Sequence, residues 1–302
     1  MSKQQPQRIP ISSLQELLES GIRIDGIQPF VFPNFAVLHR VNSNQVIKGM
    51  FSMNVPYRVD DFRFLFFHQG NVRIVANLLE VEVSGGTIGF MGNGGIVQFE
   101  DISPSVEVSG IVLKGDFLNV VMNGHLPNAL NGSVRNFYVK VKENEMEIVE
   151  RMIVTMRMIL EDADCNSKSV ASLLAAAINY ICSLYERYGN CHRETQTRVQ
   201  DMFKKFIVLV NEHGSRHHTL DFYADRLCVT KRYLGTLVHK VSGVKAKEWI
   251  DRAIITDAKV ALKHSDISVS QLSEELRFPT PSFFCKFFKR MTGTTPAGYR
   301  SE

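Results

Sequence analysis

Cysteine is scarce in this chain of 302 residues, and its five cysteines include no C-x-x-C pair. An odd count without that spacing is typical of reduced thiols in a cytoplasm. The first ten residues, MSKQQPQRIP, are polar and lack the apolar core of a secretory signal. No run of eighteen apolar residues occurs, so no membrane span is expected and a cytoplasmic location is predicted.

The residue patterns of metal enzymes and nucleotide-binding enzymes are also missing. A cupin enzyme needs two or three His and a Glu at inward strand positions. The chain has no H-x-H pair, and its candidates are scattered: His39, His68, Glu80, Glu82 and Glu100, with His125 in an expected loop. The glycine-rich run from Gly89 to Gly95 has no Walker lysine, which favours hairpin turns over a phosphate loop. No catalytic residue, metal ligand or cofactor is predicted, and an enzyme is not expected.

Charge is distributed unevenly along the chain. The net charge is +4, but residues 196–302 hold 18 Lys and Arg against 11 Asp and Glu, which is +7 and leaves −3 for residues 1–195. A basic C-terminal part beside a mildly acidic remainder is compatible with nucleic-acid binding at one end.

One helical pattern occurs twice in the last eighty residues, and such repeats are informative. The offset is 49 residues as far as Val229 and 50 from Thr230 onward, so the second copy has one extra residue in its turn. The first copy consists of Leu220, Ala224, Leu227, Val229, Thr230, Tyr233, Leu234, Leu237, Val238, Val241 and Gly243. The second consists of Val269, Ser273, Leu276, Phe278, Thr280, Phe283, Phe284, Phe287, Phe288, Met291 and Gly293.

Each copy predicts a short helix that ends at Leu227 or Leu276, then a turn and a second helix. Thr230 and Thr280 stand where an N-cap is needed, and Pro281 follows at the first helical position. The second helices are expected to end before Gly243 and Gly293. This order is typical of a helix-turn-helix, whose second helix enters the DNA major groove.

A single helix, from about Ala246 to Leu262, is predicted between the copies. At 1.5 Å per residue it spans roughly 25 Å. A strut of that length can hold two recognition helices about one DNA turn, roughly 34 Å, apart.

These features resemble the DNA-binding domain of the AraC/XylS family of bacterial transcription regulators. The chain departs from the family at Arg277, where glycine is usual, and at Ile254, where the linker helix usually has arginine. The strongest similarity is the closing run Phe278-x5-Phe284-x2-Phe287-Phe288-Lys289 followed by Gly293-x-Thr295-Pro296-x2-Tyr299-Arg300.

The outward positions of the two second helices predict the residues that contact DNA. Tyr233 and Phe283 are counted among the core positions. Arg232 is the expected bidentate contact to guanine, while Lys231 and Lys240 are expected at phosphates. The predicted DNA-binding set is Thr230, Lys231, Arg232, Thr236, His239, Lys240, Thr280, Ser282, Cys285, Lys286 and Lys289. A solvated loop is favoured over a zinc site for His213, His217 and His218.

The fold class predicted for the whole chain is α+β. Short β-branched and aromatic segments between Phe30 and Val121, at 35–41, 45–51, 62–68, 71–76, 79–83, 87–91 and 106–113, indicate a sandwich or barrel. A short helix is expected from Ser12 or Ser13 to Leu18. Aromatic residues in the β region suit either a ligand cavity or a plain core: Phe51, Tyr57, Phe62, Phe64, Phe66 and Phe67.

The resemblance implies a cupin-like sensor domain over residues 1–140. Helices at 144–163 and 168–188 have wide apolar faces and lie in a connecting, dimerisation segment, 141–192. Residues 196–302 are the all-α DNA-binding domain, which has two helix-turn-helix motifs joined by a linker helix.

The predicted function is that of a sequence-specific transcription regulator. Its expected partners are operator DNA, a second copy of the chain, a small-molecule effector and RNA polymerase. Two other functions stay open: a cupin-like metal enzyme with a helical accessory domain, and a protein-interaction module built on the repeat.

Overall fold

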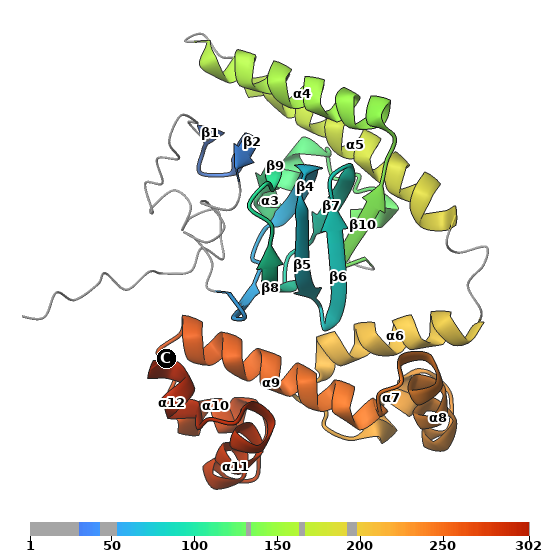
Figure 1. Cartoon of the computed structure of the whole chain (residues 1–302), viewed down its shortest axis with the longest axis vertical. Coiled ribbons are helices and arrows are strands. Elements are labelled where there is room, and N and C mark those ends of the chain that lie inside the picture. The colour runs from blue at the N-terminus through green and yellow to red at the C-terminus, as the bar shows by residue number, and fades with distance from the viewer. Residues whose placement is uncertain (1–29, 43–52, 131–133, 163–166, 192–197, 302) are drawn as a thin grey trace, which may run out of the picture. The chain divides into compact units, whose positions relative to one another are not determined.

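The computed structural model describes residues 30–42, 53–130, 134–162, 167–191 and 198–301 (Figure 1). The chain divides into two compact units, residues 1–194 and residues 195–302. The short helix expected after Ser12 and the strand expected from Gln45 to Phe51 lie outside the described residues.

Two antiparallel sheets form the β part of the first unit. Their strand orders are β1-β2-β9-β4-β7-β10 and β3-β8-β5-β6. The strands are β1 (Phe30–Val31), β2 (Phe35–Asn42), β3 (Pro56–Arg58), β4 (Phe62–Gln69), β5 (Asn71–Ala76), β6 (Leu79–Ser84), β7 (Thr87–Met91), β8 (Ile96–Ile102), β9 (Glu107–Leu113) and β10 (Asn136–Lys140). The expected strands around β2, β4 to β7 and β9 are confirmed, whereas β3, β8 and β10 were not anticipated.

The six-stranded sheet is buried on both faces. Alternate residues of a strand point to opposite faces, so Phe64 and Phe66 of β4 pack toward the helices while Phe67 packs toward the four-stranded sheet. Phe90 and Phe137 stack with a centroid distance of 5.1 Å in the helix-side core. The aromatic residues that suggested a ligand cavity therefore fill the two cores wherever the structure describes them.

Helices cover one face of the six-stranded sheet. They are α3 (Gly115–Val121), the 3-10 turn η1 (Asn128–Leu130), α4 (Glu143–Glu161) and α5 (Ser167–Cys191), of which α4 and α5 lie side by side (Figure 1). Val149 and Ile153 of α4 and Ile178 and Ile181 of α5 are fully buried in this core. The buried residues of both helices thus serve packing within the unit, while Met158 and Ile148 of α4 are exposed.

One stretch of α5 is unusually apolar for its length. Lys168–Gly189 is long and apolar enough to cross a membrane by length and composition, although no such segment was expected. The same composition is found in core helices, and Leu174, Ala177 and Ile178 on this stretch are fully buried against the sheet. Packing within the unit accounts for the buried share of this apolar stretch, which is 39%.

The second unit is helical wherever it has regular structure in the described range 198–301. Its helices are α6 (Arg198–His213), α7 (Leu220–Arg226), α8 (Lys231–Ser242), α9 (Ala246–His264), α10 (Val269–Glu275), α11 (Pro281–Thr292) and α12 (Pro296–Ser301). The predicted boundaries of both short helices, both second helices and the linker helix are confirmed to within two residues.

The long helix α9 lies between the two copies and contributes to the core of each. Trp249 packs edge-on against Phe203 of α6 at 5.8 Å, whereas Ile255 and Leu262 belong to the core formed with α10, α11 and α12. Ile254, at the position of the family's usual arginine, is 1% exposed. A buried apolar contact therefore replaces the expected polar one.

Candidate nucleic-acid interface

The turns between the paired helices have the same hydrogen bonds in both copies. In the first, Cys228 N donates to Asp225 O and Val229 N donates to Ala224 O. In the second, Arg277 N donates to Glu274 O and Phe278 N donates to Ser273 O. These are the two bonds of a Schellman motif, which ends a helix with one left-handed residue.

The left-handed residue is not glycine in either turn. Cys228 has φ 54° and Arg277 has φ 55°. The departure at Arg277 therefore leaves the turn geometry intact, and the backbone of both copies stores the strain that a Cβ brings to this region.

Both second helices begin and end as expected. The Thr230 hydroxyl accepts a hydrogen bond from Tyr233 N at 3.2 Å, and the Thr280 hydroxyl accepts one from Phe283 N at 3.3 Å. Gly243 and Gly293 follow the last turns with φ of 70° and 84°. Local signals alone fixed the limits of the recognition helices.

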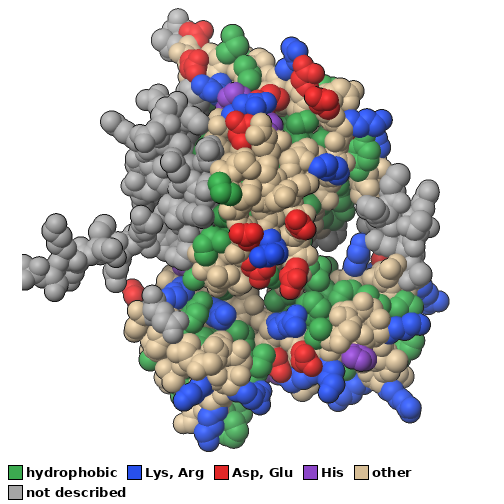
Figure 2. Space-filling view, in the orientation of Figure 1, with side chains coloured by type: hydrophobic (Ala, Val, Ile, Leu, Met, Phe, Trp, Pro, Cys, Tyr) green, Lys and Arg blue, Asp and Glu red, His purple; other side chains and the backbone are tan. Residues whose placement is uncertain are grey.

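The predicted DNA-binding residues lie on the outer sides of α8 and α11. All of them are exposed except Cys285, which is half-buried. Lys231 is paired with Asp221 of α7 at 2.8 Å, and the Thr236 hydroxyl donates to the Arg232 carbonyl. Lys and Arg side chains are also visible along the helical unit in Figure 2.

The assignment of Tyr233 and Phe283 to the core is wrong. Tyr233 is 49% exposed and Phe283 is 62% exposed, whereas Leu234 and Phe284, one residue later, are fully buried. Each exposed ring stands at the third position of its recognition helix, and the two positions correspond at the offset of 50 residues. Helix periodicity placed both residues at the border of the apolar stripe, where sequence alone does not decide burial.

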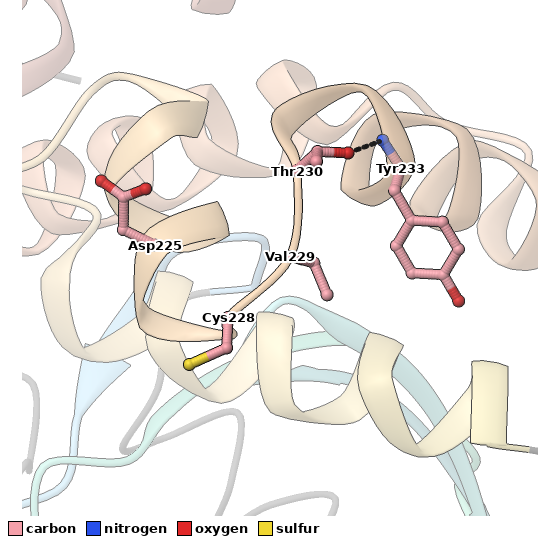
Figure 3. A pocket seen from close by; sticks show the side chains of 5 residues that line it. All are labelled: Asp225, Cys228, Val229, Thr230 and Tyr233. Atoms are coloured by element: carbon pink, nitrogen blue, oxygen red, sulfur yellow. Dashed lines mark hydrogen bonds between the residues drawn. The ribbon is translucent and has the colours of Figure 1, made fainter.

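An open hollow lies beside the first recognition helix. It is lined by Asp225, Cys228, Val229, Thr230 and Tyr233. Figure 3 shows the Tyr233 ring directed away from the capping hydrogen bond that its own backbone makes to Thr230. The edge of the helix-turn-helix is thus open to a partner at the point where the recognition helix starts.

The repeat extends to one more helix in each copy, beyond the helix-turn-helix. Lys245 and Thr295 precede the next helices, α9 and α12, again 50 residues apart. Trp249 and Tyr299 then occupy corresponding positions, and Tyr299 packs edge-on against Phe288 at 5.7 Å. The sequence carries a signal for this extension, because an aromatic residue follows each helix-ending glycine at the same spacing, in Gly243-x5-Trp249 and Gly293-x5-Tyr299.

The histidines before α7 are half-buried and contact aromatic rings, so the expected loop at His217 and His218 is only partly solvated. The His217 ring stacks on Phe222 at 3.7 Å, and the His218 ring lies 5.1 Å from Phe278 of the second copy. Burial is the largest cause that lowers the pKa of both imidazoles. These rings join the two helix-turn-helix motifs.

A second polar cluster, which we call the Glu150 network, joins α4 to the six-stranded sheet. The Glu150 carboxylate lies 2.8 Å from His39 Nε2, 3.1 Å from His68 Nε2 and 2.6 Å from Arg40 Nε. Arg157 donates to His39 Nδ1 at 2.9 Å, so the proton of a neutral His39 is on Nε2 and faces Glu150.

Ion pairs and hydrogen bonds hold the Glu150 network together. In the described part of the chain, no group of three or more His, Cys, Asp or Glu side chains is arranged to hold a metal ion. His39 and His68, the histidines considered for a cupin metal site, are instead joined by the carboxylate of Glu150. Of the other candidates, Glu100 lies 3.5 Å from Arg73.

Comparison with known proteins identifies the helical unit. A family model described as a helix-turn-helix domain matches residues 223–302. The regulatory protein PocR of Salmonella typhimurium is 24% identical over 48% of this chain and 48% of its own length. An uncharacterized transcriptional regulatory protein of Bacillus subtilis, YesN, is 26% identical over 69% of this chain and 56% of its own length.

The chain thus spans about half the length of the curated relatives it matches. Among solved structures, unsaturated fatty acid-bound ToxT from Vibrio cholerae is 14% identical, covers 89% of this chain and 95% of its own, and has a TM-score of 0.39. The helical unit of this chain, with its paired motifs and its terminal signature, is a helix-turn-helix domain of the AraC/XylS family.

Proposed function

We propose that the chain is a transcription regulator that binds double-stranded DNA through α8 and α11 in successive major grooves. One observation carries this proposal: two recognition helices with the same caps, turns and stops have their basic and hydroxyl residues on the outside. Basic and hydroxyl side chains can bind phosphates and can also form hydrogen bonds with base edges.

The first recognition helix has the better residues for reading bases. Arg232 is exposed and no described residue pairs with it, so its guanidinium is available for the two acceptors of a guanine. In α11, the expected base or phosphate contact is Lys286, while half-buried Cys285 and the ring of Pro281 offer little hydrogen bonding. We infer that α8 selects sequence more strongly than α11.

Selection from random duplex DNA at two salt concentrations tests the proposal. The expected result is one enriched motif with two half-sites about one helical turn apart. Arg232→Ala is expected to lose about 5- to 150-fold in affinity and to relax the preference at one base pair. Arg151→Ala, an exposed arginine of α4, is the control and keeps the wild-type motif. Retention of DNA without enrichment would leave only a basic domain.

We further propose that the chain acts in the cytoplasm as a homodimer. Met158 of α4 is 65% exposed and Ile148 is 39% exposed, which supports an apolar contact on this helix. Light scattering of the purified chain is expected to give twice the chain mass, and Met158→Glu is expected to shift it toward the monomer. We also propose that a small molecule controls the regulator and that the regulator contacts RNA polymerase.

A further inference from the structure

We propose that Tyr233 and Phe283 select thymine by contacting its 5-methyl group in the major groove. This inference rests on the proposed function and adds two residues that no basic or hydrogen-bonding pattern indicates. Each recognition helix would then read DNA with one exposed aromatic ring beside its polar contacts.

The exposure of these rings is not explained by folding. Phe283 is 62% exposed and Tyr233 is 49% exposed, so each ring leaves much of its apolar surface in water and stabilises the unit little. A single exposed apolar residue needs no explanation. Here, however, two aromatic rings are exposed at the same position of the two copies, 50 residues apart. That coincidence requires an explanation.

Their place in the helix favours contact with bases. Both stand in the first turn, directly after the capping threonines, and the N-terminal residues of a recognition helix reach the base edges. Helical side chains lean toward the N-terminus, so both rings lie over that end of the helix. Thr236 follows Tyr233 at i+3 on α8, and Lys286 follows Phe283 at i+3 on α11. At this spacing, the two residues of each pair lie on the same face of their helix.

Charge complementarity identifies DNA as the occupant of this surface. Exposed cations share the helix face of each ring: Lys240 follows Tyr233 at i+7, and Lys286 and Arg290 follow Phe283 at i+3 and i+7. An apolar group inside a basic surface matches a groove whose walls are phosphates and whose floor carries thymine methyls. If this surface served a partner protein instead of DNA, the chain would select no motif in the test below.

Deoxyuridine provides the direct test, because it lacks only the 5-methyl group of thymidine. Each thymine of the selected motif is replaced in turn, and binding of the full-length chain is measured. The unmodified chain is expected to lose about fourfold in affinity at each contacted thymine, the effect of one buried methyl. Tyr233→Ala is expected to abolish that loss in one half-site and Phe283→Ala in the other.

Val208→Ala is the matched control, since Val208 is an exposed apolar residue of α6, 37% exposed and outside both recognition helices. It is expected to keep the full thymine preference. Because all three side chains are exposed, the variants should unfold at the wild-type midpoint, which separates a lost contact from a lost fold.

Two negative results have different meanings. If the chain selects a motif but Tyr233→Ala and Phe283→Ala leave the difference between thymine and uracil unchanged, this inference is wrong and the proposed function stands. If the unmodified chain selects no motif at either salt concentration, the proposed function fails and this inference fails with it.

Discussion

Cys228 and Arg277 occupy the same place in the two turns, where a glycine is free of strain and an L-residue is not. Their φ angles of 54° and 55° lie in the left-handed region. A Cβ in this region destabilises the folded state by roughly 1–2 kcal/mol. Glycine avoids that strain, but it loses more conformational entropy on folding, which costs about 0.5–1 kcal/mol. We therefore expect Arg277→Gly to raise the free energy of unfolding by about 0.5–1 kcal/mol.

Urea denaturation followed by tryptophan fluorescence measures this effect, because the single tryptophan of the chain, Trp249, lies in the helical unit. Arg277→Ala is the control, since it removes the charged side chain but keeps the Cβ. A gain of similar size in Arg277→Ala would mean that the side chain, and not the backbone, is the source of the strain.

His68 predicts how the first unit responds to pH. Burial is the largest cause that lowers the pKa of His68 below 6.5. As the pH falls below 6.5, His68 therefore binds a proton in the unfolded chain more readily than in the folded unit, and the free energy of unfolding decreases. Burial acts to raise the pKa of Glu150, but the hydrogen bonds from Arg40 and His39 and the charge of Arg40 outweigh it and the pKa is lowered. The carboxylate thus stabilises the unit above its unfolded pKa, and this part is lost at lower pH.

We expect amide exchange in α4 and β9 to accelerate as the pH is lowered from about 7 to about 5, beyond the intrinsic change of exchange with pH. His68→Gln should reduce this acceleration. His125→Gln changes an exposed loop histidine outside the Glu150 network and should leave it unchanged. If amide exchange accelerated equally in the two variants, protonation of His68 would not be the cause of the acceleration.

At the scale of elements, the recognition helices depend on one capping hydroxyl each. Thr280 accepts from Phe283 N at the start of α11, and loss of such a cap costs about 0.5–2 kcal/mol. Thr280→Ala is expected to lower stability by about 1 kcal/mol, and Thr280→Ser to restore most of it, as measured by urea denaturation. Thr256→Ala is the control, because that hydroxyl only bonds the Arg252 carbonyl within α9 and should be neutral.

Elements whose limits are set locally were predictable from the sequence. Thr230, Gly243, Thr280 and Gly293 mark the ends of α8 and α11 through interactions within a few residues. The Glu150 network has no such signal, because His39 and Glu150 are 111 residues apart and meet only when α4 packs on β2. The exposure of Tyr233 is of the same kind, since burial at the edge of an apolar stripe depends on which neighbour covers it.

At the scale of the whole molecule, the uneven charge predicts how binding depends on salt. A protein that neutralises several phosphates loses affinity with a slope of about −0.9 per phosphate in a double-logarithmic plot. Residues 196–302 carry the net charge of +7, and Lys240 is an exposed lysine of α8 that no described residue pairs with. Lys240→Ala is expected to weaken binding on all sequences alike and to reduce the slope by about 1.

Lys231 should behave differently, although it lies on the same helix. Its ammonium group is 2.8 Å from Asp221 in the free protein, so contact with a phosphate requires that pair to break. Lys231→Ala should therefore lose less affinity than Lys240→Ala, and Asp221→Asn should strengthen binding at low salt by freeing Lys231. Fluorescence anisotropy over a salt series measures all three. A change of base preference in Lys240→Ala would contradict the assignment, because a phosphate contact positions the helix without reading sequence.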